Sequence, residues 1–120
     1  MSWTIELHEA FVEEVASFEK DVKLRLAVSI KLLEEFGPQL KRPYSDTLKG
    51  SSYPNMKELR FSTDDGVWRV AYAFDPERKA ILLVGGDKSG VSQKRFYKSL
   101  IKRADERFTQ YLSKLNGEGS

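Results

Sequence analysis

Residues 56–90 read MKELRFSTDDGVWRVAYAFDPERKAILLVGGDKSG, in which three short apolar segments are separated by turn signals. Asp65-Gly66 is typical of a two-residue hairpin, whose primed turn needs positive φ. Asp75-Pro76 marks a second turn. This stretch therefore predicts three antiparallel strands, near residues 56–62, 67–75 and 79–85.

The middle strand, VWRVAYAF, alternates between two faces because successive side chains of a strand point to opposite sides. One face carries Trp68, Val70, Tyr72 and Phe74, and the other carries Arg69 with Ala71, Ala73 and Asp75. Arg69 thus stands among small side chains, which leaves room for a cation to reach a phosphate. We predict a phosphate-binding surface on this side.

The flanking residues predict helices around the strands. Residues 3–7 read as a strand, and apolar residues at helical spacing predict helices over 9–18 and from Asp21 to the Gly37-Pro38 stop. Residues 41–54 read as a loop, and Ser92 caps a helix that runs to about Lys114. The fold class is α+β in the order β-α-α-β-β-β-α, with an N-terminal αα-hairpin, one domain over residues 1–115 and a disordered tail over 116–120.

Composition narrows the classes of protein. With 120 residues, 40% of them hydrophobic, the chain can bury one hydrophobic core without covalent cross-links. The absence of cysteine excludes disulfides and thiolate sites, and a single histidine, His8, excludes multi-histidine zinc motifs. No apolar run approaches the roughly 20 residues that span a bilayer, and no signal peptide opens the chain. We expect a soluble, cytoplasmic protein, and a structural role for His8.

Charge is unevenly distributed along the chain. Residues 1–40 carry 4 Lys and Arg against 8 Asp and Glu, a net charge of −4, whereas residues 41–120 carry 16 against 10, a net charge of +6. The second region is the candidate anion-binding side. Its last helix carries Lys94, Arg95 and Lys98, which either contact RNA or form a solvated face.

The segment GGDKSG, residues 85–90, joins a strand to this helix, at a position where backbone N–H groups can hold an anion. It is not a Walker A loop, because Asp87 rather than glycine precedes Lys88. Two interpretations remain open: a flexible turn, or a lysine presented to phosphate.

Five segments together resemble the RelE/ParE superfamily of bacterial toxins, and within it the HigB-like, phage-related branch. They are LKGS at 48–51, ELRF at 58–61, VWRVAYAFDP at 67–76, LLVGGDKSG at 82–90 and FYKSLIKRAD at 96–105. The resemblance covers nearly the whole chain, from Ile5 to Leu112, and its strength lies in the order and spacing of the segments.

The resemblance implies a toxin of a type II toxin-antitoxin system that cleaves messenger RNA in the ribosomal A site. In this family the 2′-hydroxyl attacks the adjacent phosphate and leaves a 2′,3′-cyclic phosphate and a 5′-hydroxyl. The family needs no metal or cofactor. The implied partners are mRNA, the ribosome and a cognate helix-turn-helix antitoxin.

The family's site residues can be placed on this sequence through the same resemblance. Arg69 matches an arginine that contacts the scissile phosphate, Lys88 a cation that stabilises the transition state, and Tyr97 a tyrosine that packs on the nucleotide or assists proton transfer. Arg60 adds a further cation to the catalytic set. Expected RNA-binding residues are Lys57, Lys94, Arg95 and Lys98.

The sequence departs from RelE on the second strand, where Met56 and Glu58 stand in place of two lysines. We hypothesise that Glu58 is the general base, because a free glutamate has a pKa of about 4.3 and is ionised at pH 7. The alternative, that Glu58 pairs with Arg60 or Arg69 to hold them, remains open.

Two other functions are compatible with the predicted fold. A ParE-like protein would inhibit DNA gyrase without RNA chemistry, although the combination of Arg69, Lys88 and Tyr97 argues against it, because ParE-type relatives tend to lack that set. A non-catalytic RNA-binding domain would use the basic last helix and cut nothing.

Overall fold

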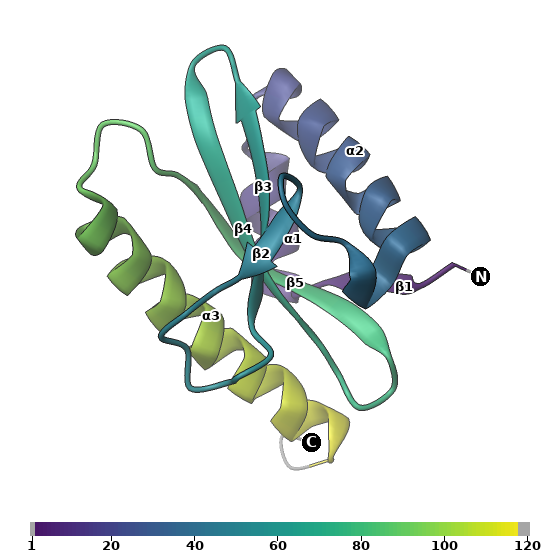
Figure 1. Cartoon of the computed structure of the whole chain (residues 1–120). Coiled ribbons are helices and arrows are strands. Elements are labelled where there is room, and N and C mark those ends of the chain that lie inside the picture. The colour runs from purple at the N-terminus through teal and green to yellow at the C-terminus, as the bar shows by residue number, and fades with distance from the viewer. Residues whose placement is uncertain (1, 118–120) are drawn as a thin grey trace.

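The computed structural model describes residues 2–117, which form a twisted five-stranded sheet with helices on both faces (Figure 1). The α+β class and the predicted element order are confirmed, with one short additional strand. In chain order the elements are β1 (Thr4–Leu7), α1 (Glu9–Ala16), α2 (Lys20–Phe36), the 3₁₀ turn η1 (Gly37–Gln39), β2 (Ser45–Thr47), β3 (Lys57–Thr63), β4 (Gly66–Phe74), β5 (Lys79–Asp87) and α3 (Gln93–Leu115).

The strands lie in the order β1-β5-β4-β3-β2. Strands β3 to β5 pair antiparallel, as expected, and β2 also pairs antiparallel with β3, whereas β1 pairs parallel with β5, with Leu7 opposite Leu82. The strand β2 corrects the expectation that residues 41–54 are all loop. Sequence patterns do not indicate β2 because it is three residues long and polar: buried Ser45 shares a 2.6 Å hydrogen bond with the Tyr72 hydroxyl.

The predicted β3–β4 hairpin is confirmed, but the prediction that it has a primed turn is wrong. Thr63 pairs with Gly66, so Asp64 and Asp65 form the turn, and none of these four residues has positive φ. Glycine is needed at position 66 because it has no side chain, and not because of its backbone conformation. A Cβ there would lie 2.8 Å from a carboxylate oxygen of Asp87. The closeness allows Asp87 Oδ1 to accept a 3.0 Å hydrogen bond from Val67 N.

Each face of the sheet has its own hydrophobic core. Helices α1 and α2 cover the face that carries Val70, Tyr72 and Leu82, and contribute Phe11, Leu26 and Leu33. Helix α3 crosses the opposite face, as Figure 1 shows, and packs Leu100, Ala104 and Phe108 against Ala71, Ala73 and Leu83. The alternation predicted for β4 is therefore confirmed, and it assigns Arg69 to the α3 face.

Helix α3 begins where the sequence predicts, since the Ser92 hydroxyl accepts a 3.3 Å hydrogen bond from Arg95 N. It ends at Leu115, with Asn116 as its C-cap. Of the tail predicted to be disordered, residues 118–120 lie outside the described residues. Within residues 2–117, every helix is too short or too polar to cross a membrane.

Candidate functional site

A cleft of about 320 Å³ lies between the β2 edge of the sheet, β3 and the start of α3. Four of the five predicted catalytic residues line it: Glu58, Arg60, Lys88 and Tyr97. The remaining lining residues are Arg42, Asp46, Thr47, Leu48, Lys49 and Gln93. The fifth predicted residue, Arg69, is bonded to Tyr97 from the neighbouring strand.

Glu58 is the most enclosed carboxylate of the cleft, with 3% of its surface exposed. It faces α3 because the even-numbered residues of β3 point to that side, opposite the α2-facing Leu59. Its Oε2 accepts a 2.8 Å hydrogen bond from Arg60, and its Oε1 accepts a 2.9 Å hydrogen bond from the Tyr97 hydroxyl. Both carboxylate oxygens are therefore engaged in this state.

Arg69 is buried, and the expectation of free space around it is wrong. Its neighbours Ala71 and Gly86 are small, but Tyr97 from α3 occupies the space that they leave. The Arg69 Nε donates to the Tyr97 hydroxyl oxygen at 3.2 Å and lies 3.9 Å from Glu58 Oε1, while Nη1 donates to the Trp68 carbonyl at 2.9 Å. Tyr97 thus connects the buried guanidinium to Glu58.

Tyr97 is held in its protonated form. Burial raises the pKa of its phenol, and the hydrogen bond to the Glu58 carboxylate raises it further. At neutral pH the side chain therefore acts as a hydrogen-bond donor toward Glu58 and an acceptor from Arg69.

Lys88 is the partly exposed lysine of the group. It follows the last residue of β5, and its side chain makes no hydrogen bond or ion pair within residues 2–117. Partial burial lowers the pKa of its ammonium group, and the nearby positive charges of Arg69 and Arg60 lower it further. Lys88 therefore presents an unpaired positive charge to the cleft, and one that gives up its proton more readily than a free lysine.

The backbone of segment 85–90 is not arranged to hold an anion. The Asp87 carboxylate accepts hydrogen bonds from Ser89 N at 2.9 Å and from the Ser89 hydroxyl at 2.6 Å. Lys88 N is bonded to the Val67 carbonyl at 2.8 Å. Since these donors are already satisfied, an incoming phosphate would meet the Lys88 side chain.

The four residues expected to bind RNA do not line the cleft. Lys57 lies on the α2 face of β3, in a different hollow with Trp3 and Phe74. The strand alternation that assigns Glu58 to the α3 face already separates Lys57 from it. Lys94, Arg95 and Lys98 are exposed at the start of α3, beside the cleft-lining positions 93 and 97.

The lining residues that sequence reasoning missed include Arg42, Lys49 and Gln93. Gln93 precedes Tyr97 by four residues, so helical spacing places both on one face and could have identified it. Arg42 and Lys49 flank the short strand β2, where no periodicity indicates which way a side chain points. Arg42 is paired with Asp46 at 2.8 Å.

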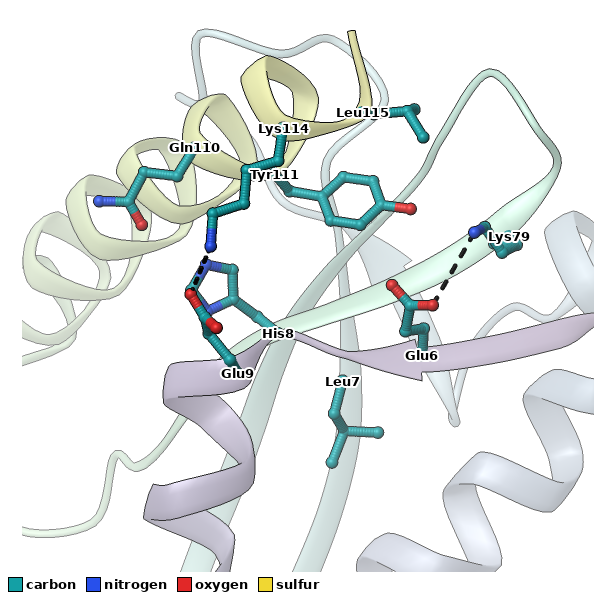
Figure 2. A pocket seen from close by; sticks show the side chains of 9 residues that line it. All are labelled: Glu6, Leu7, His8, Glu9, Lys79, Gln110, Tyr111, Lys114 and Leu115. Atoms are coloured by element: carbon teal, nitrogen blue, oxygen red, sulfur yellow. Dashed lines mark hydrogen bonds and ion pairs between the residues drawn. The ribbon is translucent and has the colours of Figure 1, made fainter. Parts of the chain in front are cut away.

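Another hollow, of about 400 Å³, lies where β1 meets α1 and the end of α3 (Figure 2). Its lysines are paired: Lys114 lies 2.7 Å from Glu9, and Lys79 lies 3.8 Å from Glu6. The structural role expected for His8 is confirmed here, because His8 Nδ1 accepts a 3.0 Å hydrogen bond from Ala10 N and caps α1. With its positive charges neutralised, this hollow is less suited to phosphate than the cleft.

No group of three or more histidine, cysteine, aspartate or glutamate side chains within residues 2–117 is arranged to hold a metal ion. The carboxylates of the cleft, Glu58 and Asp46, are each bonded to an arginine. The chemistry available in the cleft is therefore that of fixed cations, a phenol and one buried carboxylate.

Comparison with known proteins gives concordant results. Residues 13–109 match the family of phage-derived Gp49-like proteins. The chain is 43% identical over 100 residues to a Mycobacterium tuberculosis protein named "Putative toxin HigB3", covering 83% of this chain and 85% of that protein. It is 45% identical over 86 residues to "Putative toxin HigB2" of the same organism, covering 71% of this chain and 42% of that longer protein.

The fold also has a solved counterpart. A mutant of the Escherichia coli toxin RelE, solved in its free state, superposes with a TM-score of 0.59 over 85% of this chain and 96% of that one, at 14% identity. At that identity the likeness concerns the fold. The family match and the HigB relatives show that the chain belongs to the Gp49-like family, with toxins named HigB among its relatives, and the fold is similar to that of RelE.

Proposed function

We propose that this toxin-antitoxin toxin is a ribosome-dependent endoribonuclease that cleaves messenger RNA in the A site without a metal. One observation carries the proposal: a single hydrogen-bonded network joins Arg60, Glu58, Tyr97 and Arg69 at the cleft, beside the unpaired Lys88. Cleaving a phosphodiester requires a proton acceptor and preorganised positive charge, and this network contains both.

The excess positive charge of the cleft favours the binding of an RNA chain, which is anionic. Arg42 and Asp46 neutralise each other, and Glu58 is bonded to Arg60. Lys49 and Lys88 make no ion pair within residues 2–117, and Arg69 adds a buried charge behind them. The excess positive charge would hold the phosphates on either side of the cut.

In the proposed reaction the 2′-oxygen attacks the adjacent phosphorus and loses its proton to Glu58. The bond between phosphorus and the 5′-oxygen breaks, which leaves a 2′,3′-cyclic phosphate. The departing 5′-oxygen takes a proton from Lys88, whose lowered pKa makes it a better donor than a free lysine. Arg69 and Arg60 stabilise the negative charge that gathers on the phosphoryl oxygens.

Each Glu58 oxygen accepts one hydrogen bond and keeps a second lone pair, so either oxygen can take the proton. A bound phosphate would also attract Arg60, which would open Oε2 toward the 2′-hydroxyl. Because only 3% of the Glu58 surface is exposed, the 2′-hydroxyl must be placed accurately to reach it, which predicts little activity on free RNA. The ribosome would supply the missing step by fixing the codon in a reactive geometry.

Membership of a toxin-antitoxin family also implies a partner protein. We propose a cognate helix-turn-helix antitoxin that silences the toxin by binding it. We also propose a cytoplasmic site of action, where translating ribosomes are found.

The test is a translation reaction on a defined mRNA, with cut sites mapped by primer extension. Wild-type protein should give cuts at A-site codons that require ribosomes, and Arg69→Ala should reduce the rate by about 10² to 10³ fold, as expected for the loss of one preorganised donor. Lys23→Ala, an exposed change on α2, is the matched control and should cut normally. Normal cutting by Arg69→Ala would refute the site, and intact mRNA with blocked gyrase supercoiling would favour the ParE-like alternative.

A further inference from the structure

A second hollow, of about 430 Å³, lies on the opposite side of the β2 edge from the cleft. We call it the Trp3 pocket; its walls include Trp3, Lys57, Phe74 and Arg78. Thr47 of β2 lines both this pocket and the cleft. Since β2 is the outermost strand of the sheet and is three residues long, only a narrow edge separates the two hollows.

The pocket contains a flat cation that lies over an aromatic ring. The guanidinium carbon of Arg78 lies 4.7 Å from the centre of the Trp3 ring. Trp3 is fixed in turn by an edge-to-face contact with Phe74, at 5.4 Å between ring centres, and by Gly37, where a Cβ would collide with the indole. Arg78 itself is exposed, so its guanidinium rests on a rigid support and remains open to a ligand.

The backbone at Arg78 does not call for an arginine. Its φ is +67°, the only positive value for a non-glycine residue within the part of the chain that the structure describes. Glycine or asparagine adopts this conformation more easily in a turn. The side chain is therefore dispensable for the β4–β5 turn, and sparsely populated backbone conformations of this kind are often found at functional sites.

The charges of the pocket select an anion. Lys57 and Arg78 make no ion pair within residues 2–117. The one carboxylate in the lining, that of Asp75, already accepts hydrogen bonds from Glu77 N, Lys79 N and the Tyr111 hydroxyl. Two unpaired cations beside aromatic side chains match a phosphate linked to a flat ring, which is the chemistry of a nucleotide.

We propose that the Trp3 pocket binds one nucleotide of a single-stranded RNA that runs from the cleft across the β2 edge. The base stacks on the guanidinium of Arg78, and Lys57 contacts the adjoining phosphate. This inference rests on the proposed function in that the RNA is the strand held in the cleft. It gives Lys57, which the sequence predicts to bind RNA, a role away from the reacting phosphate.

The experiment measures binding of a short fluorescent 2′-O-methyl RNA to the full chain by anisotropy over a series of salt concentrations. This RNA lacks the attacking hydroxyl, so binding is read whether or not the protein cleaves. Arg78→Gly should raise Kd about tenfold, the size expected for one lost stacking contact. Lys57→Gln should make the plot of log Kd against log salt shallower by about 0.7, as for one lost phosphate contact.

Lys23→Gln, an exposed change near the other end of α2, is the matched control and should bind as wild type. Because glycine suits the backbone at position 78, Arg78→Gly should keep its thermal midpoint, which separates lost binding from lost folding. Failure of wild type to bind, or equal binding by all three variants, overturns the proposal. Equal RNA binding with a weakened antitoxin complex in Arg78→Gly would also overturn it and assign the pocket to a protein partner.

Discussion

The Tyr97 hydroxyl donates a 2.9 Å hydrogen bond to Glu58 Oε1 and so joins α3 to β3 at the cleft. The same oxygen accepts from Arg69 Nε at 3.2 Å. One phenol therefore positions both the proposed base and the proposed phosphate-binding cation. Within residues 2–117 no buried polar side-chain atom lacks a partner, so the network is complete before substrate arrives.

Replacing Tyr97 by phenylalanine tests this link. The ring still packs beside Phe96, but Glu58 and Arg69 each lose a buried hydrogen-bond partner. We expect a loss of about 1–3 kcal/mol in the free energy of unfolding, measured with urea, and a lower kcat in the translation assay. Unchanged stability and kcat would mean that Tyr97 does not hold the network.

Changing Glu58 to glutamine separates its two suggested roles. Glutamine retains an acceptor for Arg60 but cannot take a proton from the 2′-hydroxyl. If Glu58 is the base, the cleavage rate falls by about 10² to 10⁴ fold while ribosome binding persists. A normal rate at every pH would leave Glu58 as a residue that only holds Arg60 and Tyr97 in place.

The lowered pKa of Lys88 predicts how the cleavage rate changes at alkaline pH. Burial, Arg69 and Arg60 lower its pKa below the usual 10.5, so the proton available to the leaving oxygen is lost earlier than from a free lysine. Cleavage should decline as the pH rises through this lowered pKa. In Lys88→Arg, which stays protonated, the decline should disappear and a slower, pH-independent rate should remain. An unchanged alkaline decline in that variant would assign it to another group.

The fold could be predicted well because its signals are periodic. The apolar stripe of α2 and the alternation in β4 identified which residues face the two cores, and Ser92 identified the start of α3. The turn at residues 64–65 was misjudged because Gly66 is needed for the approach of Asp87, a contact between residues 21 positions apart. Sequence alone does not reveal that requirement.

The site was predictable only in part for the same reason. Motif positions on strands and helices, such as Glu58, Arg60 and Tyr97, do converge on the cleft. The burial of Arg69 was not foreseen, because it depends on the angle at which α3 delivers Tyr97 across the sheet. Arg42 and Lys49 lie beside β2, and the conformation of that segment follows from its pairing with β3 rather than from local sequence.

Arg107 should contribute more to stability than any exposed ion pair of α3. Its guanidinium donates to both oxygens of Glu14, at 2.7 and 2.6 Å, and to the Leu83 carbonyl at 2.8 Å, and so ties α1 to β5 and α3. Arg107→Met should lower the free energy of unfolding by about 1–3 kcal/mol. The control Lys114→Met, which breaks the solvent-exposed pair with Glu9, should leave it unchanged in urea titrations. If both changes lowered the free energy of unfolding equally, Arg107 would contribute no more to stability than an exposed ion pair.

His8 should make the stability of the protein depend on pH near neutrality. Burial lowers its pKa from the usual 6.5, and the positive charge of Arg107 lowers it further, although Glu9 and Gln110 act in the opposite direction (Figure 2). In the unfolded chain His8 takes up a proton near pH 6.5, whereas the folded chain resists it because Nδ1 must accept from Ala10 N.

The unfolded state therefore binds more protons in this window, and stability falls as the pH drops below about 6.5 and levels off once the folded His8 is also protonated. Urea unfolding between about pH 5 and 7.5 measures the slope. The variant His8→Asn keeps a side-chain acceptor at the N-cap but does not titrate, so it should flatten the curve while retaining stability at pH 7.5. A slope that persists in His8→Asn would trace the pH dependence to other groups.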